Sequence, residues 1–220
     1  LDDFFSLGGD SISAMALGTM LRKSGYELKP RDIFAGRTIE NIAKLIKPLE
    51  TRTKHAQEGL VEPLPMWRWF EEKFGLDTSY VQAVFVGIEK EVTLNVLQSA
   101  VKQFVGGHSI CKLAYEGEKY RIRAASEIDT NSWIEQVQLA SFSGAEIDGV
   151  FERRSRTLTP IKQRLSHFVL CRDPEGNQGL MILAHHLIVD GVSWRVLIPQ
   201  LRTMVNSVLN AEATDVEGEI

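Results

Sequence analysis

The feature that most constrains this chain is a polar, proline-bearing stretch between two parts with different hydrophobic patterns. The stretch KPLETRTKHAQEGLVEPLP covers residues 47–65, contains three prolines and carries no sustained apolar period. Such a composition is typical of a linker between domains. We therefore expect two separately folded parts, residues 1–48 and 63–220, joined by a linker over residues 49–62.

The first part has helical spacing. The segment SISAMALGTMLRKSG predicts an amphipathic helix, with one apolar stripe formed by Ile12, Met15, Ala16 and Met20. PRDIFAG predicts a short helical turn, and a second helix is expected over Ile39–Lys47 behind a Thr38 cap. Short loops join these helices.

The second part mixes strand and helix patterns. β-Branched and apolar runs predict strands at residues 79–89, 164–173 and 179–188, and a hairpin around Glu116–Glu118. Helical spacing predicts helices at residues 93–108, at 132–142 and from 193 onward. The expected order is β-α-β-β-α-β-β-α, which describes an α/β sandwich layer and lacks the glycine-loop signature of a nucleotide-binding fold.

Charge and cysteine content exclude several function classes. A formal net charge of -4 argues against an electrostatic nucleic-acid binder. No apolar run is long enough to cross a bilayer, so we expect no membrane association. Cys111 and Cys171 stand sixty positions apart, which suits neither a disulfide framework nor a metal knuckle. We expect two reduced thiols in a cytoplasmic protein.

A serine opens the first helix. In FFSLGGDSI, Gly8 and Gly9 permit a tight turn, and the positive end of the helix favours a phosphate close to Ser11. The structural alternative is that Ser11 is simply the N-cap of that helix. No histidine lies nearby in sequence to act as a base, which argues against a nucleophilic catalytic serine.

The whole segment LGGDSISAMALGTMLRKSGYELKPRDIFAGRTIENIAKLI resembles the phosphopantetheine attachment site of acyl and peptidyl carrier proteins. The resemblance covers residues 1 to about 48. It implies that Ser11 carries a covalent 4′-phosphopantetheine arm, with Asp10 and Gly9 preceding it as in the family. It also implies a surface near Ser11 that docks partner domains and includes Leu7, Ile12 and Met15.

Two adjacent histidines end an apolar strand in AHHLIVDGVSW, residues 184–194. Because neighbouring strand residues point to opposite faces, only one of His185 and His186 can enter a given cleft, and the pair cannot hold one metal from the same side. We therefore expect no metal site. A histidine here can be a satisfied core group or, as a neutral imidazole, a general base.

This string resembles the HHxxxDG motif of the condensation and epimerization domains of nonribosomal peptide synthetases, which have the chloramphenicol-acetyltransferase-like fold. The resemblance assigns His186 to the tunnel where substrates meet. It gives His185 and Asp190 structural roles, with Asp190 in an ion pair with an arginine, and Gly191 a close backbone turn. In GGHSICKLAYE, similar to the family's HHDxLRxxF segment, Lys112 replaces the usual arginine.

Two strings favour the epimerization version. The motif continues into Val-Ser-Trp, with Ser193 and Trp194, and PLPMWRWFEE resembles that subfamily's opening motif through Pro65, Trp69 and Phe70. Trp67 stands where that motif has glutamine. An epimerization domain also follows the carrier whose residue it inverts, and this is the order of the two parts here.

The resemblance thus implies an α+β chain in which a partial acyl-carrier helical bundle (1–48) is linked to an incomplete chloramphenicol-acetyltransferase-like α/β sandwich lobe (63–220). The chain starts at Leu1 in mid-pattern, and we expect it to be part of a longer protein. The carrier's first helix and the sandwich's C-terminal lobe, which supplies a second catalytic glutamate, would lie outside it. We expect this chain alone to be inactive.

The implied function is inversion of the α-carbon, from L to D, of an aminoacyl or peptidyl thioester held on the carrier. Two alternatives stay open: a condensation domain that forms peptide bonds, and a non-catalytic carrier and docking segment. The implied partners are an adenylation domain, a phosphopantetheinyl transferase, a downstream condensation domain and the C-terminal lobe.

Overall fold

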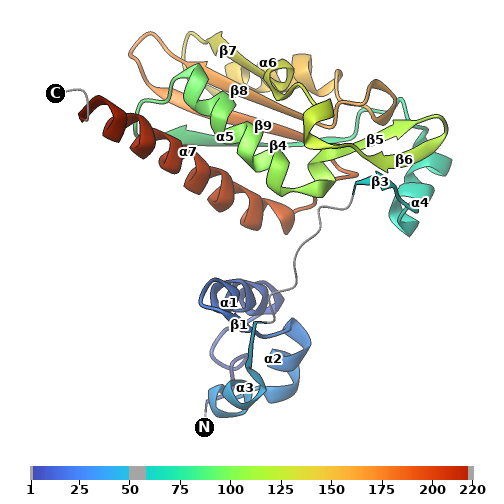
Figure 1. Cartoon of the computed structure of the whole chain (residues 1–220), viewed down its shortest axis with the longest axis vertical. Coiled ribbons are helices and arrows are strands. Elements are labelled where there is room, and N and C mark those ends of the chain that lie inside the picture. The colour runs from blue at the N-terminus through green and yellow to red at the C-terminus, as the bar shows by residue number, and fades with distance from the viewer. Residues whose placement is uncertain (1, 50–57, 218–220) are drawn as a thin grey trace. The chain divides into compact units, whose positions relative to one another are not determined.

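The computed structural model of the chain describes residues 2–49 and 58–217 (Figure 1). These residues divide into two compact units, within 1–55 and 56–220. Most of the expected linker, residues 50–57, lies outside the described residues. Its last part does not behave as a linker, because Gly59–Leu60 form a strand that pairs within the second unit.

The first unit is mainly helical, as its periodicity predicts. Its described elements are α1 Ser11–Lys23, β1 Tyr26–Glu27, α2 Pro30–Gly36, α3 Ile39–Leu45 and β2 Lys47–Pro48. The two short strands pair in antiparallel fashion. This pairing ties the chain just after α1 to the chain just after α3.

The buried face of α1 is not the stripe that the spacing suggested. Ala14 is fully buried and packs in a cluster with Leu28, Ile33 and Ile42, whereas Ala16 and Met20 are exposed. Leu17 and Leu21 are as apolar as the predicted stripe and lie beside it, so periodicity alone cannot choose between the two faces. Packing against α2 and α3 makes the choice.

The second unit is a layered α/β structure. Its described helices and strands are β3 Gly59–Leu60, α4 Pro65–Phe74, β4 Val81–Ile88, α5 Leu94–Gly107, β5 Leu113–Glu116, β6 Lys119–Ile122, β7 Ile134–Gln138, α6 Gly144–Ser155, β8 Ser166–Arg172, β9 Gln178–His185 and α7 Ser193–Glu217. The main sheet has the order β4-β9-β8-β7, and a smaller sheet has the order β3-β6-β5. Within the main sheet, β7 and β8 run parallel and the other pairs are antiparallel.

Helices cover both faces of the main sheet. Leu180 and Ile182 of β9 lie in the large apolar cluster with α5 and α7, which pack side by side over one face (Figure 1). Met181 and Leu183 lie in a second cluster with α6 on the other face. Every residue of β9 is buried, so its side chains alternate between the two apolar clusters on the two faces of the sheet.

The expectations for residues 132–155 need correction. The predicted helix at 132–142 is wrong: Ile134–Gln138 form β7, which pairs in parallel with β8. Trp133 and Val137 fit a helical period as well as a strand, and the neighbouring strand decides between them. The following helix, α6, was not predicted, although its buried and partly buried apolar residues Ile147, Val150 and Phe151 have helical spacing.

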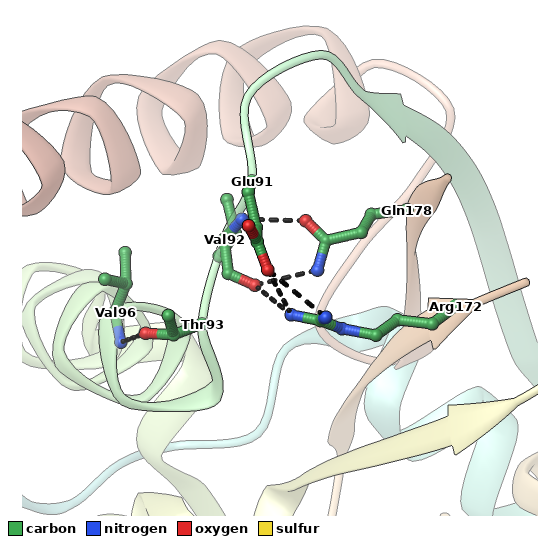
Figure 2. A network of polar contacts seen from close by, with 6 residues as sticks. All are labelled: Glu91, Val92, Thr93, Val96, Arg172 and Gln178. Carbon is green, nitrogen blue, oxygen red and sulfur yellow. Dashed lines mark hydrogen bonds and ion pairs between the residues drawn. The ribbon is translucent and has the colours of Figure 1, made fainter. Parts of the chain in front are cut away.

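A buried glutamine fixes the start of α5 to the sheet (Figure 2). The Val92 amide donates to Gln178 Oε1 at 2.7 Å, and Gln178 Nε2 donates back to the Val92 carbonyl at 2.9 Å. Arg172 donates to the same carbonyl and pairs with Glu91 at 3.3 Å. The side chain of Gln178 thus replaces a strand partner for Val92, one residue before the Thr93 cap of α5.

Gln178→Leu should destabilise the second unit by about 2 kcal/mol, because the buried Val92 amide then has no acceptor. Urea unfolding followed by tryptophan fluorescence measures this, since all four tryptophans lie in the second unit. Gln103→Leu on the exposed face of α5 is the matched control and should change the free energy of unfolding by less than about 0.5 kcal/mol. Equal losses of unfolding free energy in the two variants would show that the Gln178–Val92 hydrogen bonds do not stabilise the unit.

Candidate functional site

The loop before α1 depends on two glycines. Gly8 has a φ of 92°, in the left-handed region that side chains other than glycine rarely adopt. A Cβ on Gly9 would lie 2.4 Å from the ring of Phe4, so no larger residue fits there. The turn therefore brings the chain tightly around Phe4 and into the helix.

The N-cap of α1 is Asp10, so the structural alternative for Ser11 is wrong. Asp10 Oδ1 accepts from the amides of Ile12 at 3.1 Å and Ser13 at 2.7 Å, and the Asp10 amide donates to Ser13 Oγ at 2.7 Å. This reciprocal pattern is a capping box. Ser11 is the first helical residue and is exposed, which leaves its hydroxyl outside the cap.

The geometry fits a phosphodiester on Ser11. An exposed hydroxyl on the first residue of a thirteen-residue helix lies at the positive end of the helix dipole, where a phosphate is favoured. Of the residues expected near the docking surface, Leu7 is 69% exposed, while Ile12 and Met15 are half-buried. Ile12 and Met15 therefore each pack partly against the unit and leave part of the side chain at the surface.

In the second unit, the end of β9 separates the two histidines. His185 is fully buried and packs edge-on against the ring of Phe70, with centroids 5.2 Å apart. Its Nε2 lies 3.0 Å from the Thr78 carbonyl, and its Nδ1 accepts from the Leu187 amide at 3.2 Å. Burial lowers the pKa of His185, which keeps the ring neutral.

His186 is only partly buried. Its ring stacks on Tyr80, with centroids 4.9 Å apart and an interplanar angle of 17°. Its Nε2 lies 2.9 Å from the amide nitrogen of Gln82, whose Oε1 accepts from the Trp194 indole at 2.8 Å. The structure thus joins His186 to Trp194, eight positions later in the same motif, through a strand residue.

The interactions of Asp190 differ from the expectation. Its carboxylate accepts from the amides of Val192 at 3.1 Å and Ser193 at 2.7 Å, and its own amide donates to Ser193 Oγ at 3.2 Å. This is the same capping pattern that Asp10 makes, here at the start of α7. These hydrogen bonds, led by that from the Ser193 hydroxyl, lower the pKa of Asp190.

The expected arginine partner of Asp190 is not present among residues 2–49 and 58–217. Lys112, at the family's arginine position, is buried and lies 3.7 Å from Glu58 instead. The expected close turn at Gly191 does not require glycine, since a Cβ there would meet open space and the φ of Gly191 is not positive. The Asp190 cap shapes this turn.

The helix α4 explains the tryptophan-rich string before the sheet. Trp67, which replaces the family's glutamine, is buried and donates its indole N–H to the Leu187 carbonyl at 3.0 Å. Phe70 contacts the His185 ring, whereas Trp69 is 47% exposed. α4 therefore holds the turn that follows the histidine pair.

Sequence reasoning missed Gln82 and Tyr80. Gln82 is the one amide in the apolar run VQAVFVGI of β4, and that exception could have marked it. What it contacts could not be read from the sequence, because His186 is 104 positions away.

The described residues contain neither a cluster of metal-ligating side chains nor a membrane-spanning helix. No group of three or more histidine, cysteine or acidic side chains in that part of the chain could hold a metal ion. Over the same residues, no helix combines the length and apolar character needed to cross a bilayer. Both cysteines are free and buried, and burial raises the pKa of Cys171 to about 11.

Comparison with known protein families identifies both parts of the chain. The family model described as Condensation domain matches residues 57–217, and the one described as Phosphopantetheine attachment site matches residues 1–46. The chain belongs to the condensation domain family, and a phosphopantetheine attachment site precedes that domain. It combines a carrier with a condensation-type domain, as nonribosomal peptide synthetases do.

A relative in Vibrio anguillarum, vanchrobactin synthetase VabF, is 39% identical over 220 residues, which is 100% of this chain and 8% of VabF. Tyrocidine synthase 2 of Brevibacillus parabrevis is 28% identical over 224 residues, covering 96% of this chain and 6% of the relative. The chain thus spans a small fraction of the length of the synthetases it matches.

Solved structures support the chloramphenicol-acetyltransferase-like fold. The epimerization domain from the third module of tyrocidine synthetase B has a TM-score of 0.61 at 24% identity, covering 70% of this chain and 36% of that one. The starter condensation domain of rhizomide synthetase RzmA has a TM-score of 0.56 at 13% identity, covering 70% and 39%. The described lobe is α+β, as expected.

Asp190→Ala should destabilise the second unit by about 1 kcal/mol, because α7 loses its capping acceptor. Asp190→Asn should retain nearly all of the stability, since an amide oxygen accepts the same backbone N–H groups. Urea unfolding by tryptophan fluorescence compares the two variants. If asparagine cost as much as alanine, the carboxylate's charge, and not its capping, would be what stabilises this turn.

Proposed function

We propose that the chain is part of an epimerizing module of a nonribosomal peptide synthetase. In this proposal residues 1–48 are a partial peptidyl carrier domain and residues 63–220 the N-terminal lobe of an epimerization-type domain. The joining segment, residues 49–62, includes Gly59–Leu60, which pair within the second unit. The order of the two family matches supports the proposal, since the attachment site precedes the condensation-type domain.

Ser11 is the residue that carries 4′-phosphopantetheine. The exposed hydroxyl of Ser11, the Asp10 cap and the Gly9 turn support this assignment. When attached, the group supplies a thiol that holds the aminoacyl or peptidyl unit as a thioester. Ser11 delivers that substrate by tethering, so the acting domain needs little affinity for the amino acid itself.

His186 acts as a general base on the α-carbon of the tethered substrate. A thioester acidifies its α-proton because the developing negative charge spreads onto the carbonyl oxygen. The α-C–H bond breaks, an N–H bond forms on the His186 ring, and the electron pair moves to that oxygen. Return of a proton to the opposite face gives the D form. The second face needs a further donor, which the family resemblance assigns to a glutamate outside the matched motifs of this chain.

The single observation that carries the proposal is the partly exposed His186 ring joined through Gln82 to Trp194. Trp194 belongs to the Val-Ser-Trp extension that resembles the epimerization subfamily, and the likeness to the tyrocidine epimerization domain points the same way. His185, Asp190 and Ser193 then act structurally, as parts of the turn that presents the base.

Peptide-bond formation is the second candidate. The matched family is described as a condensation domain, and the fold also resembles the starter condensation domain of rhizomide synthetase. In that case the His186 ring would receive a proton from an attacking amine and not from an α-carbon. The two reactions differ in whether a second, acceptor substrate is needed.

The partners follow from the proposed module. A phosphopantetheinyl transferase modifies Ser11, an adenylation domain loads it, and a downstream condensation domain takes the inverted residue. The C-terminal lobe of the same domain completes the active site.

Incubation with a phosphopantetheinyl transferase and coenzyme A should add one phosphopantetheinyl group to the chain, detected by intact mass spectrometry. Ser11→Ala should abolish the addition. Ser6→Ala, an exposed serine in the same loop, should leave it unchanged. Modification that survives in Ser11→Ala would refute the assigned attachment residue.

A synthetase containing this sequence, loaded at Ser11 with an L-aminoacyl group, should accumulate the D form without any acceptor substrate, as chiral chromatography after thioester cleavage measures. His186→Ala should slow this by about 10²- to 10⁴-fold, the usual contribution of a general base. His108→Gln, a histidine in contact with Gln200 of α7, should keep the rate. If the only product is a peptide that forms when an acceptor substrate is added, the result would support condensation instead.

A further inference from the structure

A glutamine bridges two aromatic side chains of the histidine motif. Gln82 comes from β4, whose register places it opposite Ala184, two residues before His186. Its amide oxygen lies 2.8 Å from the Trp194 indole nitrogen, and its amide nitrogen lies 2.9 Å from His186 Nε2. Both arms of one amide are therefore used, one on each ring.

The indole decides which arm is which. A tryptophan Nε1–H can only donate a hydrogen bond, so the Gln82 atom that faces Trp194 must be the oxygen. The other arm of Gln82 is then the NH₂ group, which can only donate. His186 Nε2 must therefore accept, which requires an unprotonated Nε2 and places the ring proton on Nδ1.

The neighbouring histidine is held in the opposite form. His185 Nδ1 accepts from the Leu187 amide at 3.2 Å, and its Nε2–H donates to the Thr78 carbonyl at 3.0 Å. The reverse tautomer would keep only the longer contact from the Tyr80 amide, at 3.3 Å. Adjacent imidazoles of the motif thus carry their protons on different nitrogens.

We propose that Gln82, oriented by Trp194, is a positioning residue that fixes His186 in the neutral tautomer with its lone pair on Nε2. This inference rests on the proposed function in giving that nitrogen the role of proton acceptor. The amide hydrogen of Gln82 occupies the same lone pair, so the substrate must displace it before the proton can be taken. Trp194 prevents the amide from turning over to present its oxygen to the ring.

In this arrangement the Val-Ser-Trp extension has a physical role. Ser193 forms hydrogen bonds with Asp190 and so starts α7, and the next residue of that first turn is Trp194. Trp194 is 9% exposed, and its indole reaches back to β4. A residue without a ring N–H at this position would leave Gln82 free to rotate.

Long-range ¹H–¹⁵N correlation spectra of the histidine-labelled chain test the proposal, because protonated and unprotonated ring nitrogens have well-separated ¹⁵N shifts. In the wild type, His186 should show a protonated Nδ1 and an unprotonated Nε2, and His185 the reverse. Gln82→Glu should invert His186 to the Nε2–H form, since a carboxylate can only accept. Trp194→Phe should give a mixture of both tautomers, because the amide can then turn over.

Gln200→Glu is the matched control. Gln200 lies 2.6 Å from His108 Nε2, so this variant should change the His108 signals and leave those of His186 unchanged. The His185 signals report that each variant is folded. Should Gln82→Glu fail to fold, Trp194→Phe decides the question alone. An Nε2–H tautomer of His186 in the wild type, or an unchanged His186 in both Trp194→Phe and a folded Gln82→Glu, would overturn the proposal.

The result is independent of the epimerization assay. If the His186 tautomer inverts in Gln82→Glu but the loaded synthetase forms no D product, Gln82 still positions the His186 ring, but that ring is not the base of an epimerization. If the synthetase forms D product but the His186 tautomer is unchanged in Gln82→Glu and Trp194→Phe, the domain is an epimerase in which Gln82 and Trp194 do not position the base.

Discussion

The alternation of side chains along β9 is the constraint on which the second unit depends. Because the strand is buried on both faces, each successive residue must suit a different compartment, one under α6 and one under α5 and α7. A shift of one residue in register would exchange the two sets and bury His186 where His185 now lies. The same alternation places Gln82, Ala184 and His186 on one side, so the geometry of the candidate site is a consequence of how the core is packed.

The chain uses one capping device at both of its candidate sites. Asp10 with Ser13, and Asp190 with Ser193, each satisfy the first amides of a helix in a reciprocal pattern. In the first unit this leaves Ser11 as an exposed residue at the positive end of α1. In the second it sets the first turn of α7, from which Trp194 reaches Gln82. Each acidic residue of these motifs therefore acts on backbone amides, and the functional side chain lies one turn or less away.

The sequence predicted most of this architecture and failed where two periods overlap. Strands such as β8 and β9 and the helix α5 have long, unambiguous patterns, and the structure confirms them. Residues 134–138 satisfy a helical period as well as a strand period, and pairing with β8 decides in favour of a strand. The buried face of α1 was assigned wrongly for a similar reason, since its apolar residues extend around more than one face. The histidine pair and the serine were found because local strings identify them, whereas Gln82 and Trp67 act across about a hundred positions.

The sequence alone predicted the family, the two-part organisation and the two candidate reactive residues, Ser11 and His186. It did so because these features are local: a string of residues, a hydrophobic period and a proline-bearing stretch can be read without knowing what they contact. That Asp190 caps a helix is visible only in the fold, and so is the Gln82 contact from which we infer that the lone pair of His186 is on Nε2. Hydrogen bonds between distant segments settle such questions, because the direction of a hydrogen bond depends on which donor the fold brings to which acceptor.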